Sequence, residues 1–334
     1  MRATALMFAG LVGTTAAKAA PLQYLSGSGV KAWPVVSLTW GVLLISLVVM
    51  MLIAGLLLAA IWHRPARIWI KGEKAEVLPD RGGLNWLWIG VGLSTLVLLF
   101  TVVWTVKVLA GIEAPSAAPA VTIEVTGRQW WWQVRYLDSD ASRQFLTANE
   151  IHIPVGRPVR LKLIGGDVIH SFWVPQLAGK MDAIPGQTNE TWIEAARPGV
   201  YKGQCTEYCG LQHAHMAFLV IAEPESRFRA WWSHQLAAPL APQGDALAGR
   251  ADFQAHCGGC HAVRGTEAQG ALGPDLSHLM QRQTIASATL PNNDPTLAHW
   301  IADPQSLKPG SLMPAPAISE TELAGIHAYL KTLD

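Results

Sequence analysis

Two long apolar runs, near positions 35–62 and 84–110, constrain the fold of this chain more than any other feature. Each run exceeds the roughly 20 residues that a helix needs to cross the hydrocarbon core of a bilayer. Neither run contains an acidic residue, and Lys107 lies at the end of the second. Tryptophans, which favour the two interfaces of a bilayer, lie mostly toward the run ends. The runs therefore predict a transmembrane helical hairpin; the alternative is a buried hairpin in a soluble protein.

The segment between the two runs indicates their orientation. It carries basic residues at Arg64, Arg67, Lys71, Lys74 and Arg81. A short loop rich in lysine and arginine stays in the cytoplasm, so both termini are expected outside, in the periplasm of a Gram-negative cell. Positions 1–19 have the layout of a cleavable signal peptide, and cleavage is expected after Ala19.

Composition and length give the broad organisation. The chain has 334 residues, of which 50% are apolar and 15% charged, as expected for a protein with membrane segments and more than one domain. The net charge of +1 gives no reason to expect a nucleic acid as partner. We expect the transmembrane hairpin over 20–112, a second domain over 113–237, a linker over 238–244 and a third domain over 245–334.

The second domain has the alternation of a β-protein. Val159, Leu161 and Leu163 alternate with charged residues, and similar runs are separated by glycine and proline. Many short strands predict a sandwich or barrel of at most about ten strands. Residues 225–237 then predict a short helix with one apolar face.

The stretch CTEYCGLQHAHM at 205–216 groups soft ligands. Cys205 and Cys209 are followed by His213 and Met216, and His170 lies upstream in VIHSFWVP. Sulfur and imidazole ligands of this kind favour copper. Zinc also accepts cysteine and histidine but has no use for a thioether. A disulfide between the two cysteines would leave the histidines and the methionine unexplained.

The third domain contains the sequence CGGCH. Cys257 and Cys260 can bond covalently to the vinyl groups of haem, while His261 binds the iron from one side. Met313, in a loop with proline and glycine, is the expected ligand on the opposite side, and Met280 is its rival. Histidine–methionine ligation raises the haem potential, which suits an electron carrier.

These motifs together resemble subunit II of the haem-copper cytochrome oxidases, with a fused C-terminal cytochrome c as in the caa-type enzymes. The resemblance implies a multidomain chain in which a two-helix transmembrane hairpin precedes an all-β cupredoxin sandwich and an all-α class I cytochrome c domain. In the binuclear copper A centre of that family, two thiolates bridge the coppers, one imidazole binds each and a thioether binds weakly. The matching positions here are Cys205, Cys209, His170, His213 and Met216. Glu207 would supply its backbone carbonyl to copper and its carboxylate to magnesium at the join with subunit I.

Further roles and one departure follow from the same resemblance. Trp130, the first of three consecutive tryptophans, matches the residue through which electrons reach copper, although plain core packing is the alternative. Lys180 and Asp182 match a segment that faces subunit I, where they would line a water and proton exit unless they belong to an ordinary solvated loop. Many members carry a glutamate near the start of the second helix. Here positions 81–84 read RGGL, and Glu76 is the nearest glutamate, so the resemblance does not extend to the usual proton-uptake residue.

The expected function is that of the electron-input subunit of a respiratory terminal oxidase in a bacterial inner membrane. Electrons would pass from cytochrome c or another donor through haem c and copper A to subunit I, where oxygen is reduced. Subunit III is a further expected partner. The alternatives are the copper A subunit of a nitric oxide reductase and a membrane-anchored copper carrier.

Overall fold

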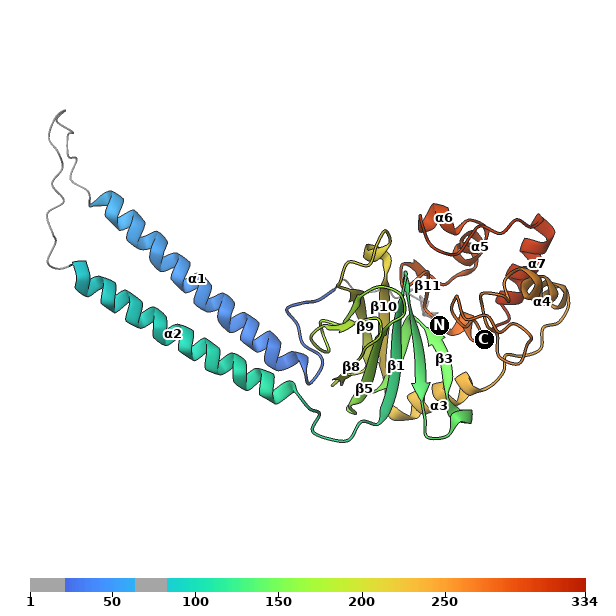
Figure 1. Cartoon of the computed structure of the whole chain (residues 1–334), viewed down its shortest axis with the longest axis horizontal. Helices are drawn as coiled ribbons and strands as arrows, with labels where there is room; N and C mark the ends of the chain where they lie inside the picture. The colour runs from blue at the N-terminus through green and yellow to red at the C-terminus, as the bar shows by residue number, and fades with distance from the viewer. Residues whose placement is uncertain (1–21, 64–82) are drawn as a thin grey trace, which may run out of the picture.

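The computed structural model describes residues 22–63 and 83–334. The expected signal peptide, the basic residues between the two apolar runs and Glu76 lie outside the described residues. Figure 1 shows two long helices that extend together from a β-sandwich, with a helical domain on the other side of the sandwich. The predicted fold class is confirmed.

The two long helices are α1 (Ala32–Trp62) and α2 (Gly83–Ile112). Both are long and apolar enough to cross a membrane, and their mean hydropathies are 3.0 and 2.2. At about 1.5 Å per residue each exceeds the ~30 Å hydrocarbon thickness. Gly41 packs directly on the Trp104 ring, because a Cβ at Gly41 would lie 2.2 Å from that ring. The Trp192 indole donates to the Ile112 carbonyl at 3.2 Å and so ties the end of α2 to the sandwich.

The sandwich consists of two five-stranded sheets, ordered β3-β2-β1-β5-β8 and β4-β10-β9-β6-β7. Its strands are β1 (Val121–Arg128), β2 (Trp131–Leu137), β3 (Phe145–Ala148), β4 (Glu150–Pro154), β5 (Val159–Gly165), β6 (His170–Trp173), β7 (Met181–Ala183), β8 (Thr188–Ile193), β9 (Gly199–Cys205) and β10 (Ala217–Glu223). Pairs β1–β5 and β4–β10 are parallel, and the other pairs within these sheets are antiparallel. The alternation predicted for β5 is present: Val159, Leu161 and Leu163 are fully buried between the sheets. Helix α3 (Glu225–Leu236) closes the core with Phe228 and Trp232.

The C-terminal domain is mainly helical. It contains α4 (Asp245–His256), α5 (Asp294–Ala302), α6 (Pro304–Leu307), α7 (Glu320–Leu330) and a small hairpin of β11 (Thr284–Ile285) and β12 (Leu290–Pro291). The hairpin was not anticipated from the sequence. Ser319 and Glu322 form a capping box at the start of α7.

Helices α4 and α7 cross where Gly249 meets Gly325. A Cβ at Gly249 would lie 1.8 Å from the Gly325 carbonyl oxygen, so the two backbones touch. We expect Gly249→Ala to destabilise this domain by about 1–3 kcal/mol, because the helices must move apart. Faster hydrogen exchange of the α4 and α7 amides measures the loss. Ala248→Ser, at the adjacent exposed position, is the control; unchanged exchange in the Gly249 variant contradicts the prediction.

Candidate metal centre and haem pocket

One end of the second sheet gathers the predicted soft ligands. His170 begins β6 and Cys205 ends β9, and these strands are paired with Phe172 opposite Cys205. Cys209 lies in the loop that follows β9. His213 lies in the short 3-10 helix His213–His215, directly before Met216 and β10. Ligands distant in sequence therefore meet because two strands and one loop converge.

The distances between these side chains suit a compact metal centre. The Sγ atoms of Cys205 and Cys209 are 3.8 Å apart. His170 Nδ1 lies 3.9 Å from Cys205 Sγ, and His213 Nδ1 lies 3.5 Å from Cys209 Sγ. Met216 Sδ lies 3.7 Å from Cys209 Sγ. The thiols are not bonded to each other, since a disulfide requires about 2.05 Å, and all five predicted ligands face one space.

The two thiols cannot both ionise unless positive charge lies close to them. The hydrogen bond with Cys209 lowers the pKa of Cys205 to about 4, with a further contribution from His170. The Cys205 thiolate and burial raise the pKa of Cys209 well above its usual range, because a second adjacent anion is unfavourable. Both sulfurs are almost completely buried. Two thiolates are stable here only with positive charge between them, so the donor set fits soft metal ions.

Asp167 holds the outer nitrogen of His170. Its carboxylate accepts from His170 Nε2 at 2.8 Å and from the backbone N–H of Gln129 and Val168 at 2.7 Å. Burial raises the pKa of Asp167, but these hydrogen bonds outweigh it and lower the pKa overall. The carboxylate thus fixes the imidazole with Nδ1 toward the cysteines. Asp167 was not predicted from the sequence, although an acid three residues before a candidate ligand histidine is a usable signal.

We expect Asp167→Ala to lower metal affinity by about 10–100-fold, the usual effect of removing the partner of a ligand histidine. Competition with a copper chelator measures the change. Glu190→Ala, at an exposed position on β8, is the matched control. Equal chelator sensitivity in the two variants would contradict the assigned role of Asp167.

The three consecutive tryptophans have three different environments. Trp132 is fully buried, and its ring lies edge-on to His170 at 5.9 Å between centroids. Trp130 is half-buried, and its Nε1 donates to the Cys209 carbonyl at 3.0 Å. Trp131, also half-buried, lines a cavity that Trp130 lines as well. Of the three indoles, Trp132 alone is fully buried in the sandwich core, and Trp130 packs against that core.

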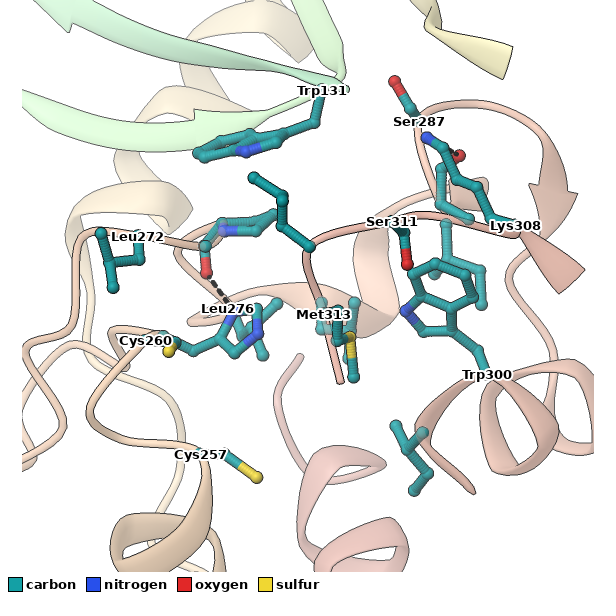
Figure 2. Close-up of a pocket in the computed structure, with 18 of the residues that line it drawn as sticks. Trp131, Cys257, Cys260, Leu272, Leu276, Ser287, Trp300, Lys308, Ser311 and Met313 are labelled. Carbon is teal, nitrogen blue, oxygen red and sulfur yellow. Dashed lines mark hydrogen bonds between the residues drawn. The ribbon is translucent and has the colours of Figure 1, made fainter. Parts of the chain in front are cut away.

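A cavity of about 470 Å³ lies between the C-terminal domain and the sandwich, and residues of both domains line it. In Figure 2, Cys257 and Cys260 lie on one side, Met313 and Trp300 on the other, and Trp131 across the top. The predicted haem-binding residues thus line a single space of the described chain, with apolar side chains filling most of the remaining wall.

His261 presents one nitrogen for a metal. Its Nδ1 lies 2.9 Å from the Pro274 carbonyl, which only accepts hydrogen bonds, so Nδ1 carries the proton and Nε2 has a free lone pair. Burial lowers the pKa of His261 and favours this neutral form. Burial also raises the pKa of Cys257 to about 11. An apolar cavity with two thiols, one oriented imidazole and one thioether fits covalent haem.

Met313 and Met280 differ in position. Met313 lines the cavity, and its backbone carbonyl accepts from Gln305 Nε2 at 2.9 Å. Met280 is absent from the cavity wall, packs against the core of the domain and donates its backbone N–H to Leu333. Met313 therefore shares the cavity with the two thiols and His261, whereas Met280 does not.

The remaining predicted residues lie at the surface. Glu207 is exposed, and its carbonyl oxygen is 3.3 Å from Cys205 Sγ. Lys180 is exposed and Asp182 is half-buried, next to β6 in the same sheet. His215 bonds to Gln212 through Nδ1 and not to the cysteines.

Comparisons with known proteins agree with this architecture. Residues 121–223 match the family Cytochrome C oxidase subunit II, periplasmic domain, and residues 246–334 match the family Cytochrome c. The chain thus combines two apolar helices, a cupredoxin-type domain and a cytochrome c domain.

The sequence identity and coverage of its relatives identify the family of this chain. Cytochrome c oxidase subunit 2 of Alkalihalophilus pseudofirmus is 45% identical over 217 residues, which are 64% of this chain and 61% of that protein. The same subunit of Bacillus sp. (strain PS3) is 32% identical over 285 residues, covering 79% and 78% of the two chains. The periplasmic domain of subunit II of cytochrome oxidase from Bradyrhizobium japonicum, a crystal structure, is 34% identical over 36% of this chain and 96% of that one, with a TM-score of 0.34. The chain belongs to the cytochrome c oxidase subunit 2 family.

Proposed function

We propose that this chain is the electron-input subunit of a respiratory terminal oxidase in a bacterial inner membrane. When bound, haem c and copper A each take up and release single electrons. Cys257, Cys260, His261 and Met313 would hold the haem. The copper ions would be held by His170, Cys205, Cys209, His213, Met216 and the carbonyl of Glu207. Cytochrome c or another donor would supply the electrons, and oxygen would be reduced in subunit I.

One observation carries this proposal: Trp130 belongs to both sites. Trp130 is one of the residues that line the haem cavity, and its Nε1 donates to the carbonyl of Cys209. A covalent and hydrogen-bonded connection therefore runs from the cavity wall to a copper ligand. Strands β6 and β9 fix the ligands of the copper site, and such a rigid frame limits the rearrangement that accompanies each electron.

The surface position of Glu207 supports a magnesium site at the join with subunit I. Its carboxylate is exposed while its carbonyl faces Cys205, so one residue would contact both metals. Oxygen is favoured over nitric oxide as acceptor, because the relatives are named cytochrome c oxidase subunit 2. The buried thiols disfavour a copper carrier, which needs an accessible site.

The test uses the purified complex with all its subunits, and subunit III is expected among them. Reduced donor should be oxidised with consumption of oxygen, and Trp130→Leu should slow copper reduction while haem reduction keeps its rate. Turnover of nitric oxide instead of oxygen would favour the alternative enzyme. Unchanged copper reduction in the Trp130 variant would remove this residue from the path.

A further inference from the structure

Lys308 is buried at the contact between the cytochrome c and copper domains. Only 3% of the residue is exposed, although lysine is rarely buried without a charged partner. Its Nζ donates to the Trp130 carbonyl at 2.8 Å and lies 3.4 Å from the Ala286 carbonyl. Lys308 takes part in none of the ion pairs of residues 22–63 and 83–334. Two carbonyls, one from each domain, thus hold the ammonium group.

Burial without a carboxylate has a cost, which shows in the titration of the group. Desolvation lowers the pKa of Lys308 to about 7. A lysine that only filled space could be replaced by an apolar residue without that cost. The ammonium group therefore contributes more than volume to this contact. It donates toward the Trp130 carbonyl of the copper domain and the Ala286 carbonyl of the cytochrome c domain.

The residues after Lys308 also rest on the metal loop. Gln212, next to the ligand His213, donates its side-chain N–H to the Pro309 carbonyl. Gly310 has φ +80°, and a Cβ there would lie 2.4 Å from Leu211 Cδ2, so the loop touches Leu211 closely. The contact is thus continuous from Lys308 to Gly310.

The same loop carries Met313 to the haem cavity. Gln305 holds its shape: the side-chain amide donates to the carbonyls of Ser311 at 2.8 Å and Met313 at 2.9 Å, and its Oε1 accepts from Gly310 N–H at 2.9 Å. The loop from Gln305 to Met313 is therefore fixed to Trp130 through Lys308, and its Met313 end lines the haem cavity. In Figure 2, Lys308 and Met313 lie along one stretch of the cavity wall.

We propose that Lys308 is a positioning residue, which locks the loop carrying Met313 onto the Trp130 carbonyl and so fixes the haem pocket against the copper site. This inference deepens the proposed function and rests on it. The linker keeps the two domains near each other without Lys308, but proximity alone does not fix their orientation. Lys308 supplies the orientation at the point where the two sites meet.

A second contact between the two domains lies away from Lys308 and can be used to measure whether the domains are docked. The Glu150 carboxylate, on β4 of the copper domain, accepts from the backbone N–H of Gln283 at 3.1 Å and of Thr284 at 2.9 Å. These two amides belong to the cytochrome c domain and exchange with solvent when the domains separate. Their exchange rate therefore measures the undocked fraction.

The experiment compares Lys308→Met with Lys331→Met in the full-length, cofactor-loaded complex. Lys331 is a half-exposed lysine of the same domain that pairs with Asp294 at 3.0 Å, away from the interface. Loss of a charge-assisted hydrogen bond should speed exchange of the Gln283 and Thr284 amides about 10–100-fold in the Lys308 variant alone.

Electron transfer from haem to copper after photoreduction should slow in the Lys308→Met variant, with the optical and paramagnetic spectra unchanged. Lys308→Arg, which keeps the charge and the donors, should restore most of both rates.

Unchanged amide exchange and an unchanged haem-to-copper rate in Lys308→Met, with both cofactors present, would overturn the proposal. Failure of the proposed function would look different: the unsubstituted complex would lack a cofactor signal, or its copper would stay oxidised when the haem is reduced. If the methionine variant does not accumulate, Lys308→Gln provides the same comparison, because a neutral, shorter side chain cannot bridge both carbonyls as the ammonium does.

Discussion

Cys209→Ser is expected to abolish the copper pair and, with it, oxygen consumption supported by the donor. Cys209 lies at the centre of the loop ligands, because its sulfur is within 3.8 Å of Cys205 Sγ, His213 Nδ1 and Met216 Sδ. A serine oxygen is a harder, shorter ligand that soft copper disfavours. Metal analysis and paramagnetic resonance of the intact chain should show loss of the two-copper signal.

His215→Ala is the control for this loss. His215 lies six residues after Cys209 but bonds to Gln212 and does not face the sulfurs. We expect it to retain copper and activity. A Cys209 variant with the copper content of the His215 variant would show that the thiol is not a ligand.

Met313→Leu is expected to have the second largest effect, on the haem. The haem should stay attached through Cys257 and Cys260, but its reduction potential should fall, because loss of the thioether removes the ligand that raises it. The fall should be a sizeable part of the ~0.8 V range over which axial ligands set haem potentials. A redox titration followed by the haem absorbance measures it, and electron transfer to copper should change with it.

Met280→Leu provides the matched comparison within the same domain. Met280 packs against the core and does not line the cavity, so a swap of similar volume should cost less than about 1.5 kcal/mol and leave the potential unchanged. A fall of the potential in the Met280 variant, with none in the Met313 variant, would reverse the assignment of the two methionines.

The ligand clusters could be predicted because their information is local. CTEYC with HAHM, and CGGCH, place most of the donors on single loops, and the strand containing His170 supplies the remaining imidazole. The two apolar helices follow from length alone. Strand alternation places consecutive tryptophans on opposite sides of a strand, but it does not tell which one contacts the Cys209 carbonyl.

The contacts between the domains could not be read from the sequence. Lys308 stands in a loop with proline and glycine, where a lysine normally points to solvent, yet its ammonium is buried against Trp130. Glu150 likewise looks like an ordinary acid but binds two amides from residues 283 and 284. Such contacts depend on how two separately folded domains meet, and no local pattern encodes that arrangement.

The most direct test of the central claim is a combined optical and paramagnetic resonance spectrum of the intact, metal-loaded chain. We expect a c-type haem with histidine and methionine ligands together with a mixed-valence copper pair, and about two copper ions for each haem if Cys205 and Cys209 bridge them. A chain that binds no copper, or a single copper with no sign of sharing between two ions, would contradict the assignment of this loop and the electron path built on it.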